Sequence, residues 1–201
     1  MEFSKNQNKV AAEMVNLISN AIGQNKVVHL ATAIKTSARL SGSFLLRSFN
    51  FDLEDVKPVT ALLSNEANEE GPLLINVIGT VLTNLNVPID DAKMDSAAIE
   101  ESQLDFIESL KATQKDAHKL KETYKLTDKE MAVSCAVTTA FIIEEAKNDL
   151  GVEVAFNTAI YGLIEGTKTM PPAMEGTSGE TASKPKPPTK PKSKKWYEFW
   201  K

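Results

Sequence analysis

Three side chains in this sequence belong to the types that most often act as nucleophiles, general bases or metal ligands: His29, His118 and Cys135. A di-iron carboxylate bundle needs a glutamate three positions before each histidine, but those positions hold Lys26 and Lys115. The helical zinc motif His-Glu-x-x-His is also missing from the sequence. We therefore predict no catalytic residue, no metal ligand and no cofactor.

One further chemical option is a nucleophile and base pair, formed if Cys135 met His29 across two packed helices. The neighbours of this cysteine are Val133, Ala136 and Val137. In such apolar surroundings a free cysteine behaves as a small hydrophobic residue. We expect Cys135 to be structural, and a single cysteine also excludes a disulfide within the chain.

A stripe of polar and basic residues runs along one side of an otherwise apolar predicted helix. Its members are Thr32, Lys35, Thr36, Arg39, Ser43 and Arg47. Such a stripe could line a cleft for an anionic ligand, with the fork-shaped guanidinium of Arg39 as the main donor. The candidate anion site consists of His29, Lys35, Arg39 and Arg47. In the alternative interpretation both arginines pair with the acidic residues of 52–55 or 66–70 and hold that connection in place.

A lysine and proline tract followed by an aromatic cluster occupies residues 181–201, which read TASKPKPPTKPKSKKWYEFWK. Both tryptophans of the chain lie here. Large aromatic side chains normally contribute to a core, so their presence in a segment of this composition indicates a docking element. The candidate docking residues are Lys192, Lys194, Lys195, Trp196, Tyr197, Phe199 and Trp200.

The composition of this segment is compatible with four uses. On an anionic membrane, each lysine near the surface contributes about 1 kcal/mol and aromatic rings settle at the headgroup boundary. In a protein pocket, Trp196 and Trp200 would share one face of a helical turn, a use that Glu198 favours. The third use is stacking on single-stranded nucleic acid. In the fourth, the aromatic residues fold back onto the helical domain.

Charge is divided unequally along the chain. Residues 181–201 carry seven lysines and one acid, a balance of +6, whereas the other 180 residues carry 16 basic and 26 acidic side chains, a balance of −10. Phosphate contacts need clustered basic residues, so an acidic body argues against nucleic-acid binding. Because no signal peptide and no bilayer-spanning apolar run is visible, we predict a cytoplasmic protein that the basic segment could bring to a membrane.

Hydrophobic periodicity and capping residues predict helices in six segments. They cover residues 5–22, 26–49, 72–85, 95–125, 127 to a break at Gly151, and 152–167. Residues 52–71 and 86–91 are expected to be connections, with Pro72 in the first turn of the third helix. The helix after residue 127 is apolar almost all round through Ile143, so we expect it to be the most buried. The predicted fold is all-α, a compact bundle of about five or six helices.

Two of these helices have surfaces that indicate how they pack. Segment 26–49 is rich in small residues that would let another helix approach closely: Ala31, Ala33, Ala38, Ser41, Gly42 and Ser43. Along residues 106–124, apolar positions alternate by four and three, a narrow seam that resembles the face of a coiled coil. This seam could also join two copies of the chain.

These observations divide the chain into a helical domain at 1–170, a disordered linker at 171–195 and a docking motif at 196–201. The linker is rich first in Gly, Ser and Thr and then in Lys and Pro. Together, the sequence features favour a non-enzymatic adaptor that binds a protein partner or an anionic membrane through its basic and aromatic residues. Two alternatives stay open. One is a ligand-binding or enzymatic domain with an anion site around His29, Arg39 and Arg47, and the other is an oligomeric scaffold.

Overall fold

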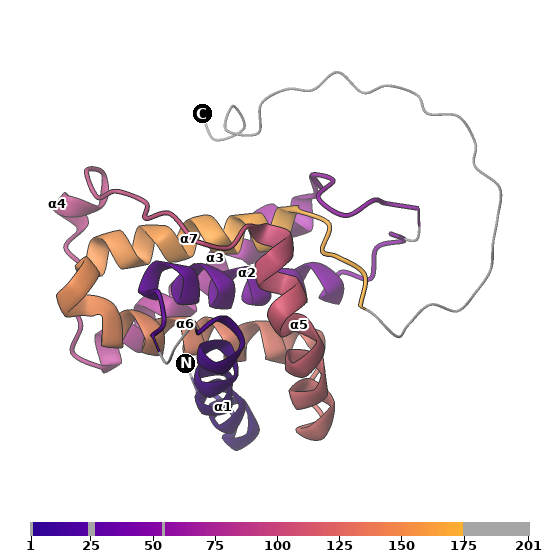
Figure 1. Ribbon diagram of the computed structural model, residues 1–201, viewed down its shortest axis with the longest axis horizontal. Helices are drawn as coiled ribbons and strands as arrows, with labels where there is room; N and C mark the ends of the chain where they lie inside the picture. The colour runs from indigo at the N-terminus through magenta and orange to yellow at the C-terminus, as the bar shows by residue number, and fades with distance from the viewer. Residues whose placement is uncertain (1, 24–26, 54, 175–201) are drawn as a thin grey trace.

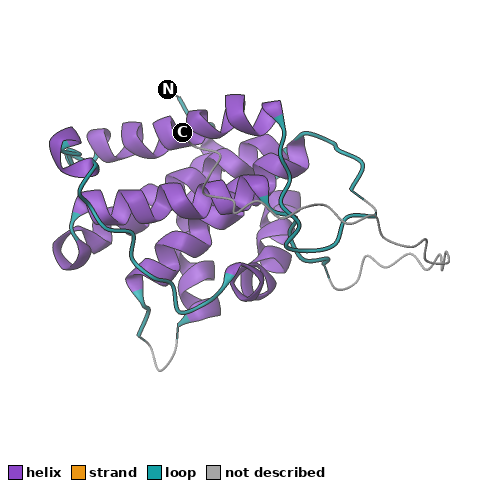
Figure 2. Cartoon of the chain, turned by 90° about the horizontal axis from the view of Figure 1, so that it is seen from above, coloured by secondary structure: helices purple, strands orange, loops and turns teal. Residues whose placement is uncertain are grey.

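The computed structural model describes residues 2–23, 27–53 and 55–174. Within these ranges the chain forms helices and no strand (Figure 2), which confirms the predicted all-α bundle. The helices are α1 (Lys5–Ile22), α2 (Leu30–Ser48), α3 (Asn65–Asn84), α4 (Asp91–Met94), α5 (Phe106–Thr123), α6 (Asp128–Leu150) and α7 (Val152–Lys168). Six of them are long, and α4 is a single turn of four residues. The docking motif and most of the predicted linker lie outside the described residues.

Side-chain caps fix the starts of several helices. Ser4 and Gln7 form a reciprocal capping box at α1, and Thr127 and Glu130 form another at α6, both as predicted. In each box the first side chain accepts from a backbone N–H three residues on, while the second side chain accepts from the first backbone N–H. Gly151 has a φ of 80°, ends α6 and precedes α7, so the predicted break is confirmed.

The most buried helix is α2, and the prediction that α6 would be was wrong. Every residue of α2 from Ala31 to Leu46 is buried, because α7 and α6 both pack against it (Figure 1). Along α6, half-buried residues such as Val133 and Phe141 interrupt the buried surface. Several polar groups on α2 tolerate burial because they find partners elsewhere in the fold: Ser41 Oγ, for example, donates to a backbone oxygen of α6 at 2.8 Å.

Three glycines allow α2 and α7 to lie in direct backbone contact. A Cβ atom on Gly42 would overlap backbone atoms of α7, and one on Gly166 would overlap the backbone oxygen of Arg39. Gly162 lies one turn before Gly166, and its Cβ position is 2.9 Å from another backbone oxygen of α2. Only glycine fits at such spacing. The close approach predicted from the small residues of α2 is therefore confirmed, and α7 is the helix that approaches.

The third helix begins earlier than predicted. Ser64 accepts a hydrogen bond from a backbone N–H three residues on, so α3 starts at Asn65 and Pro72 lies in its interior. The prediction was wrong because proline was taken as the first-turn residue, whereas the serine cap is the stronger signal here. Part of the acidic run that precedes Pro72 in the sequence is used for packing, since Glu70 pairs with Lys129 of α6 at 2.5 Å.

Residues 95–105 do not belong to the helix that was predicted to start at Asp95. Instead α5 begins at Phe106, after a capping box formed by Asp105 and Glu108. The preceding segment passes along α7 on its way from α4 to α5 (Figure 1). It has no helical hydrogen bonding over most of its length, because side chains of α2 and α7 bind its backbone groups. Those partners are remote in sequence, so periodicity alone did not reveal them.

The apolar seam of α5 is largely used within the chain. Phe106, Leu110 and Ala117 are buried, and α5 packs against α1 and α2. At the far end, Leu120 and Tyr124 are only half-buried. A role of this seam in joining two copies stays a prediction, and only its far end remains accessible for it.

Candidate functional site

Among the described residues, no three histidine, cysteine or acidic side chains are grouped to hold a metal ion. Cys135 is fully buried in the core, and this burial raises the pKa of its thiol far above the ordinary value. Its backbone oxygen accepts from Ser37 Oγ at 3.2 Å, which places it opposite Ser37 on α2. His29 precedes Ser37 by eight residues, or about 12 Å along a helix axis. The structure therefore does not bring the cysteine and this histidine together.

Arg39 has the largest set of partners in the predicted anion site. Its side chain is 5% exposed, and Nε donates to Glu165 Oε2 at 2.8 Å. Nη1 donates to the backbone oxygens of Leu104 and Asp105 at 2.9 and 3.0 Å, and to Ser109 Oγ at 3.1 Å. These partners belong to α7, to α5 and to the segment before α5, not to the acidic residues of 52–55 or 66–70. Arg39 thus connects three parts of the chain to α2.

Two other side chains of the polar stripe bind the backbone of the same segment. Lys35 Nζ donates to the backbone oxygen of Glu100 at 3.1 Å. Thr32 Oγ1 accepts from the backbone N–H of Gln103 at 2.9 Å. Burial lowers the pKa of the Lys35 ammonium, although nearby carboxylates oppose this shift. The chain's own backbone therefore occupies donors that the sequence suggested for an anion.

The structure distributes the four residues of the predicted anion site over three places. His29 is the N-cap of α2, where its Nδ1 accepts from the backbone N–H of Thr32 at 3.3 Å. It lines a cleft of about 550 Å³ that neither Lys35 nor Arg39 lines. Those two residues lie together beneath the segment before α5. Arg47 lies at the opposite end of α2 from His29 and lines a different cleft.

This other cleft has a volume of about 400 Å³. It is lined by Leu46, Arg47, Asn50, Phe51, Leu53, His118, Asp128, Met170 and Pro171. Helix α2 contributes Arg47, α5 contributes His118 and α6 contributes Asp128, while the segments after α2 and α7 provide apolar walls. The predicted anion site included Arg47 but not His118, because no spacing rule relates a position on α2 to one on α5. Two signals were available in the sequence: the residue type of His118, and its position directly after Ala117 of the apolar seam.

The guanidinium of Arg47 has few partners. Its one hydrogen bond to the described residues runs from Nη2 to Gln114 Oε1 and is long, at 3.4 Å. Burial lowers the pKa of Arg47 and the charge of Asp128 opposes this effect, but an arginine stays protonated at neutral pH. Asp128 itself is paired, because Lys121 Nζ donates to its Oδ1 at 2.7 Å.

His118 is a neutral group in the same cleft. Its ring packs against Phe44 with the centroids 4.7 Å apart. Nε2 is buried and has no hydrogen-bond partner among the described residues. Burial, followed by the positive charges of Arg47 and Lys121, lowers the pKa of His118 to about 4, with Asp128 opposing the shift. The imidazole is therefore uncharged at pH 7.

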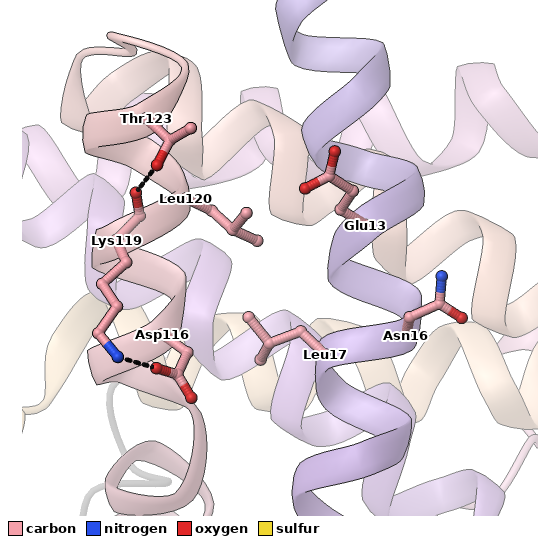
Figure 3. A pocket seen from close by; sticks show the side chains of 7 residues that line it. All are labelled: Glu13, Asn16, Leu17, Asp116, Lys119, Leu120 and Thr123. Atoms are coloured by element: carbon pink, nitrogen blue, oxygen red, sulfur yellow. Dashed lines mark hydrogen bonds and ion pairs between the residues drawn. The ribbon is translucent and has the colours of Figure 1, made fainter.

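A further cleft, of about 370 Å³, lies between α1 and α5 (Figure 3). It is lined by Glu13, Asn16, Leu17, Asp116, Lys119, Leu120 and Thr123. Leu17 and Leu120 point toward each other across it (Figure 3). On the α5 side Lys119 pairs with Asp116 at 2.6 Å, so the charges of that rim already have partners. The cleft offers a small apolar surface rather than a set of reactive groups.

Comparison with known proteins leaves the function to be argued from these features. No protein-family model matches the chain, and no curated protein and no solved structure matches it significantly. In the part of the chain that the structure describes, no helix is both long enough and apolar enough to cross a membrane. The candidate docking residues, from Lys192 to Trp200, lie outside that part.

Proposed function

We propose that this chain is a non-enzymatic interaction protein that attaches to an anionic membrane surface through residues 184–200. The observation that carries the proposal is the segregation of charge and aromatic residues in the sequence. Both tryptophans and seven lysines lie in residues 181–201, which carry +6, whereas the remainder of the chain carries −10. Lysines attract anionic headgroups and aromatic rings favour the interface, so this segment combines the two components of a peripheral membrane anchor.

The expected strength of such an anchor is moderate and depends on salt. Six lysines lie between Lys184 and Lys195, and each contributes about 1 kcal/mol when it is near an anionic surface. The attraction decays over a Debye length of about 8 Å at physiological ionic strength, so added salt weakens it. The acidic body is repelled by the same surface, which would keep the helices off the membrane while the segment is bound.

The helical body supports this proposal by giving the segment a fixed starting point. After α7, the Met170 N–H donates to the Thr60 oxygen and the Val59 N–H donates to the Met170 oxygen, both at 2.9 Å. Gln114 Nε2 on α5 donates to the Pro172 oxygen at 3.2 Å. The chain is therefore held against the body as far as Pro172. Binding of residues 184–200 to a membrane would consequently attach the whole helical domain to it.

A pocket on a protein partner is the second candidate for the docking surface. Trp196 and Trp200 are four residues apart and would share one face of a helical turn, as aromatic anchors of short motifs do. Glu198 lies between them and gains nothing on an anionic membrane, whereas a protein pocket could use it. This candidate predicts binding that depends on the tryptophans more than on the number of lysines.

Vesicle flotation tests the membrane proposal. The full chain would be mixed with phosphatidylcholine vesicles that contain or lack phosphatidylserine, at low and high salt. One variant replaces Lys190, Lys192, Lys194 and Lys195 by Gln. The matched control replaces the same number of exposed body lysines by Gln: Lys5, Lys9, Lys111 and Lys115. We expect flotation with the anionic vesicles only, loss of flotation at high salt and in the first variant, and retention in the control.

Equal flotation of both lysine variants, or none of the unmodified chain, would contradict the membrane proposal. In the second case, a Trp196→Ala and Trp200→Ala double variant would show whether binding to a protein partner depends on the tryptophans. A chain that ends at Glu180 tests the fold-back alternative. We expect it to melt at nearly the same temperature as the full chain, because the proposal leaves the aromatic residues off the body. A clear drop in melting temperature would place them on it.

A further inference from the structure

The cleft at the end of α2 contains polar groups that the fold does not satisfy. Arg47 has five N–H donors, as every arginine does, and makes one long hydrogen bond to the described residues. In the same cleft, His118 Nε2 is buried without a partner. Folded proteins pair nearly all of their buried polar groups, so the buried Nε2 of His118 calls for an explanation, whereas the half-buried Arg47 keeps N–H donors that no described residue uses. A bound ligand would provide the missing partner for the guanidinium.

The charge of the cleft specifies the charge of that ligand. Arg47 and Lys121 are positive, Asp128 is negative and His118 is neutral at pH 7. Because Asp128 is already paired with Lys121 at 2.7 Å, one positive charge remains among these four described residues, and it belongs to Arg47. A ligand with a single negative charge would balance it. A dianion would leave a second charge unbalanced and close to the Asp128 carboxylate.

The walls of the cleft specify the rest of the ligand. The apolar residues that line it are Leu46, Phe51, Leu53, Met170 and Pro171. Its volume of about 400 Å³ lies in the range of small-molecule sites, roughly 300 to 1,000 Å³. Apolar walls with one charged donor are the usual composition of such sites, in which the apolar surface supplies affinity and the polar group fixes orientation. The ligand should therefore carry its charge at one end of an apolar body.

We propose that this cleft binds a small organic acid whose single carboxylate contacts Arg47 and whose aliphatic or aromatic body contacts Phe51, Leu53 and Met170. A guanidinium offers two parallel N–H donors that match the two oxygens of a carboxylate. The inference is independent of the membrane proposal, because it concerns only the helical body and none of residues 184–200.

Titration with octanoate tests the inference, and octanamide is the neutral probe of the same shape. The full chain, labelled with nitrogen-15, would be titrated while the side-chain Nε–H signal of Arg47 is followed by NMR. We expect octanoate to shift this signal in a saturable way. Octanamide should bind at least about tenfold more weakly, because it cannot form the charge-assisted pair. Inorganic phosphate should compete weakly, since it lacks the apolar body.

Substitutions at position 47 separate the charge from the fold. Arg47→Gln should weaken octanoate at least about tenfold, and Arg47→Lys should retain part of the affinity. Lys111→Gln, an exposed change elsewhere on α5, should leave it unchanged. The inference would be overturned by equal affinity for octanoate and octanamide, by full affinity in Arg47→Gln, or by absence of saturable binding. A Phe51→Ala variant that keeps full octanoate affinity would also overturn it, since the apolar wall would then play no part.

Discussion

Arg39 and Arg47 stand eight residues apart on α2, about 12 Å along its axis, and their surroundings differ sharply. Arg39 is buried and makes hydrogen bonds to Glu165, to Ser109 and to two backbone oxygens. Arg47 is half-buried, faces a cleft and makes one hydrogen bond of 3.4 Å. Two arginines on the same helix therefore differ in burial and in the number of hydrogen bonds that they make.

The difference separates arginines that hold a fold from arginines that remain available to a ligand. Removal of the Arg39 side chain would leave the Glu165 carboxylate without its donor and would take one of two hydrogen bonds from each of the Leu104 and Asp105 oxygens, which is costly in a buried site. Removal of the Arg47 guanidinium would take away a poorly compensated charge and one long hydrogen bond. We therefore expect the Arg39 end of α2 to determine stability and the Arg47 end to determine binding.

The largest expected loss of stability comes from a substitution that disrupts the backbone contact between α7 and Arg39. Gly166→Ala would place a Cβ atom onto the backbone oxygen of Arg39. We expect it to lower the free energy of unfolding by about 3 kcal/mol or more, because backbone atoms of two packed helices would have to separate. Urea denaturation followed by circular dichroism measures this change.

Gly79→Ala is the matched control for that substitution. The nearest atom to a Cβ on Gly79 would be the ring tip of Phe156, at 4.0 Å. Because alanine is the better residue in a helix interior, we expect this variant to be as stable as the unmodified chain, or up to about 1 kcal/mol more stable. Similar losses in both glycine variants would show that the close contact between α2 and α7 is not the cause.

A smaller effect is expected at the Arg47 end of α2, where His118 should make the free energy of unfolding depend on pH. The pKa of His118 is lowered from its ordinary value of 6.5 to about 4 in the folded chain. The unfolded chain therefore takes up this proton more readily, and stability that is present above pH 6.5 is lost as the pH falls toward 4. The expected loss between pH 7 and pH 4.5 is about 2 kcal/mol.

His118→Phe isolates this contribution, because phenylalanine fills a similar volume and carries no titratable group. The difference in free energy of unfolding between this variant and the unmodified chain should change with pH in the interval from 6.5 to 4. Carboxylates also titrate in this range, but they do so in both proteins, so their contribution to the free energy of unfolding cancels in the difference. Parallel pH profiles for the two proteins would contradict the neutral, buried state of His118.

The elements that could be predicted from sequence are those whose signals are local. The capping boxes of Ser4 with Gln7 and of Thr127 with Glu130 lie within single turns, and both helices begin where the boxes indicate. The small residues of α2 correctly predicted a close neighbour, but nothing local identified α7 as that helix. Residues 95–105 were wrongly assigned to a helix. Their hydrogen-bond partners lie on α2 and α7, far away in the sequence, so no local signal revealed them.

The candidate sites show the same limit. Lys35 and Arg39 were predicted to be anion ligands from residue type and helical spacing, and both do lie on one helix, α2. Their actual partners include backbone oxygens of a segment 65 or more positions away, and no pattern within α2 indicates them. Arg47 was selected for the same reason, yet its relation to His118 appears only when α2 and α5 pack together.

The most direct test of the comparison is a pair of urea denaturations on Arg39→Gln and Arg47→Gln. We predict that Arg39→Gln lowers the free energy of unfolding by about 3 kcal/mol, since it breaks the ion pair with Glu165 and removes the hydrogen bonds to Ser109 and to two backbone oxygens. Arg47→Gln should change it by less than about 1 kcal/mol in either direction. Equal losses in the two variants, or a larger loss at Arg47, would contradict the division of α2 into a structural end and an available end.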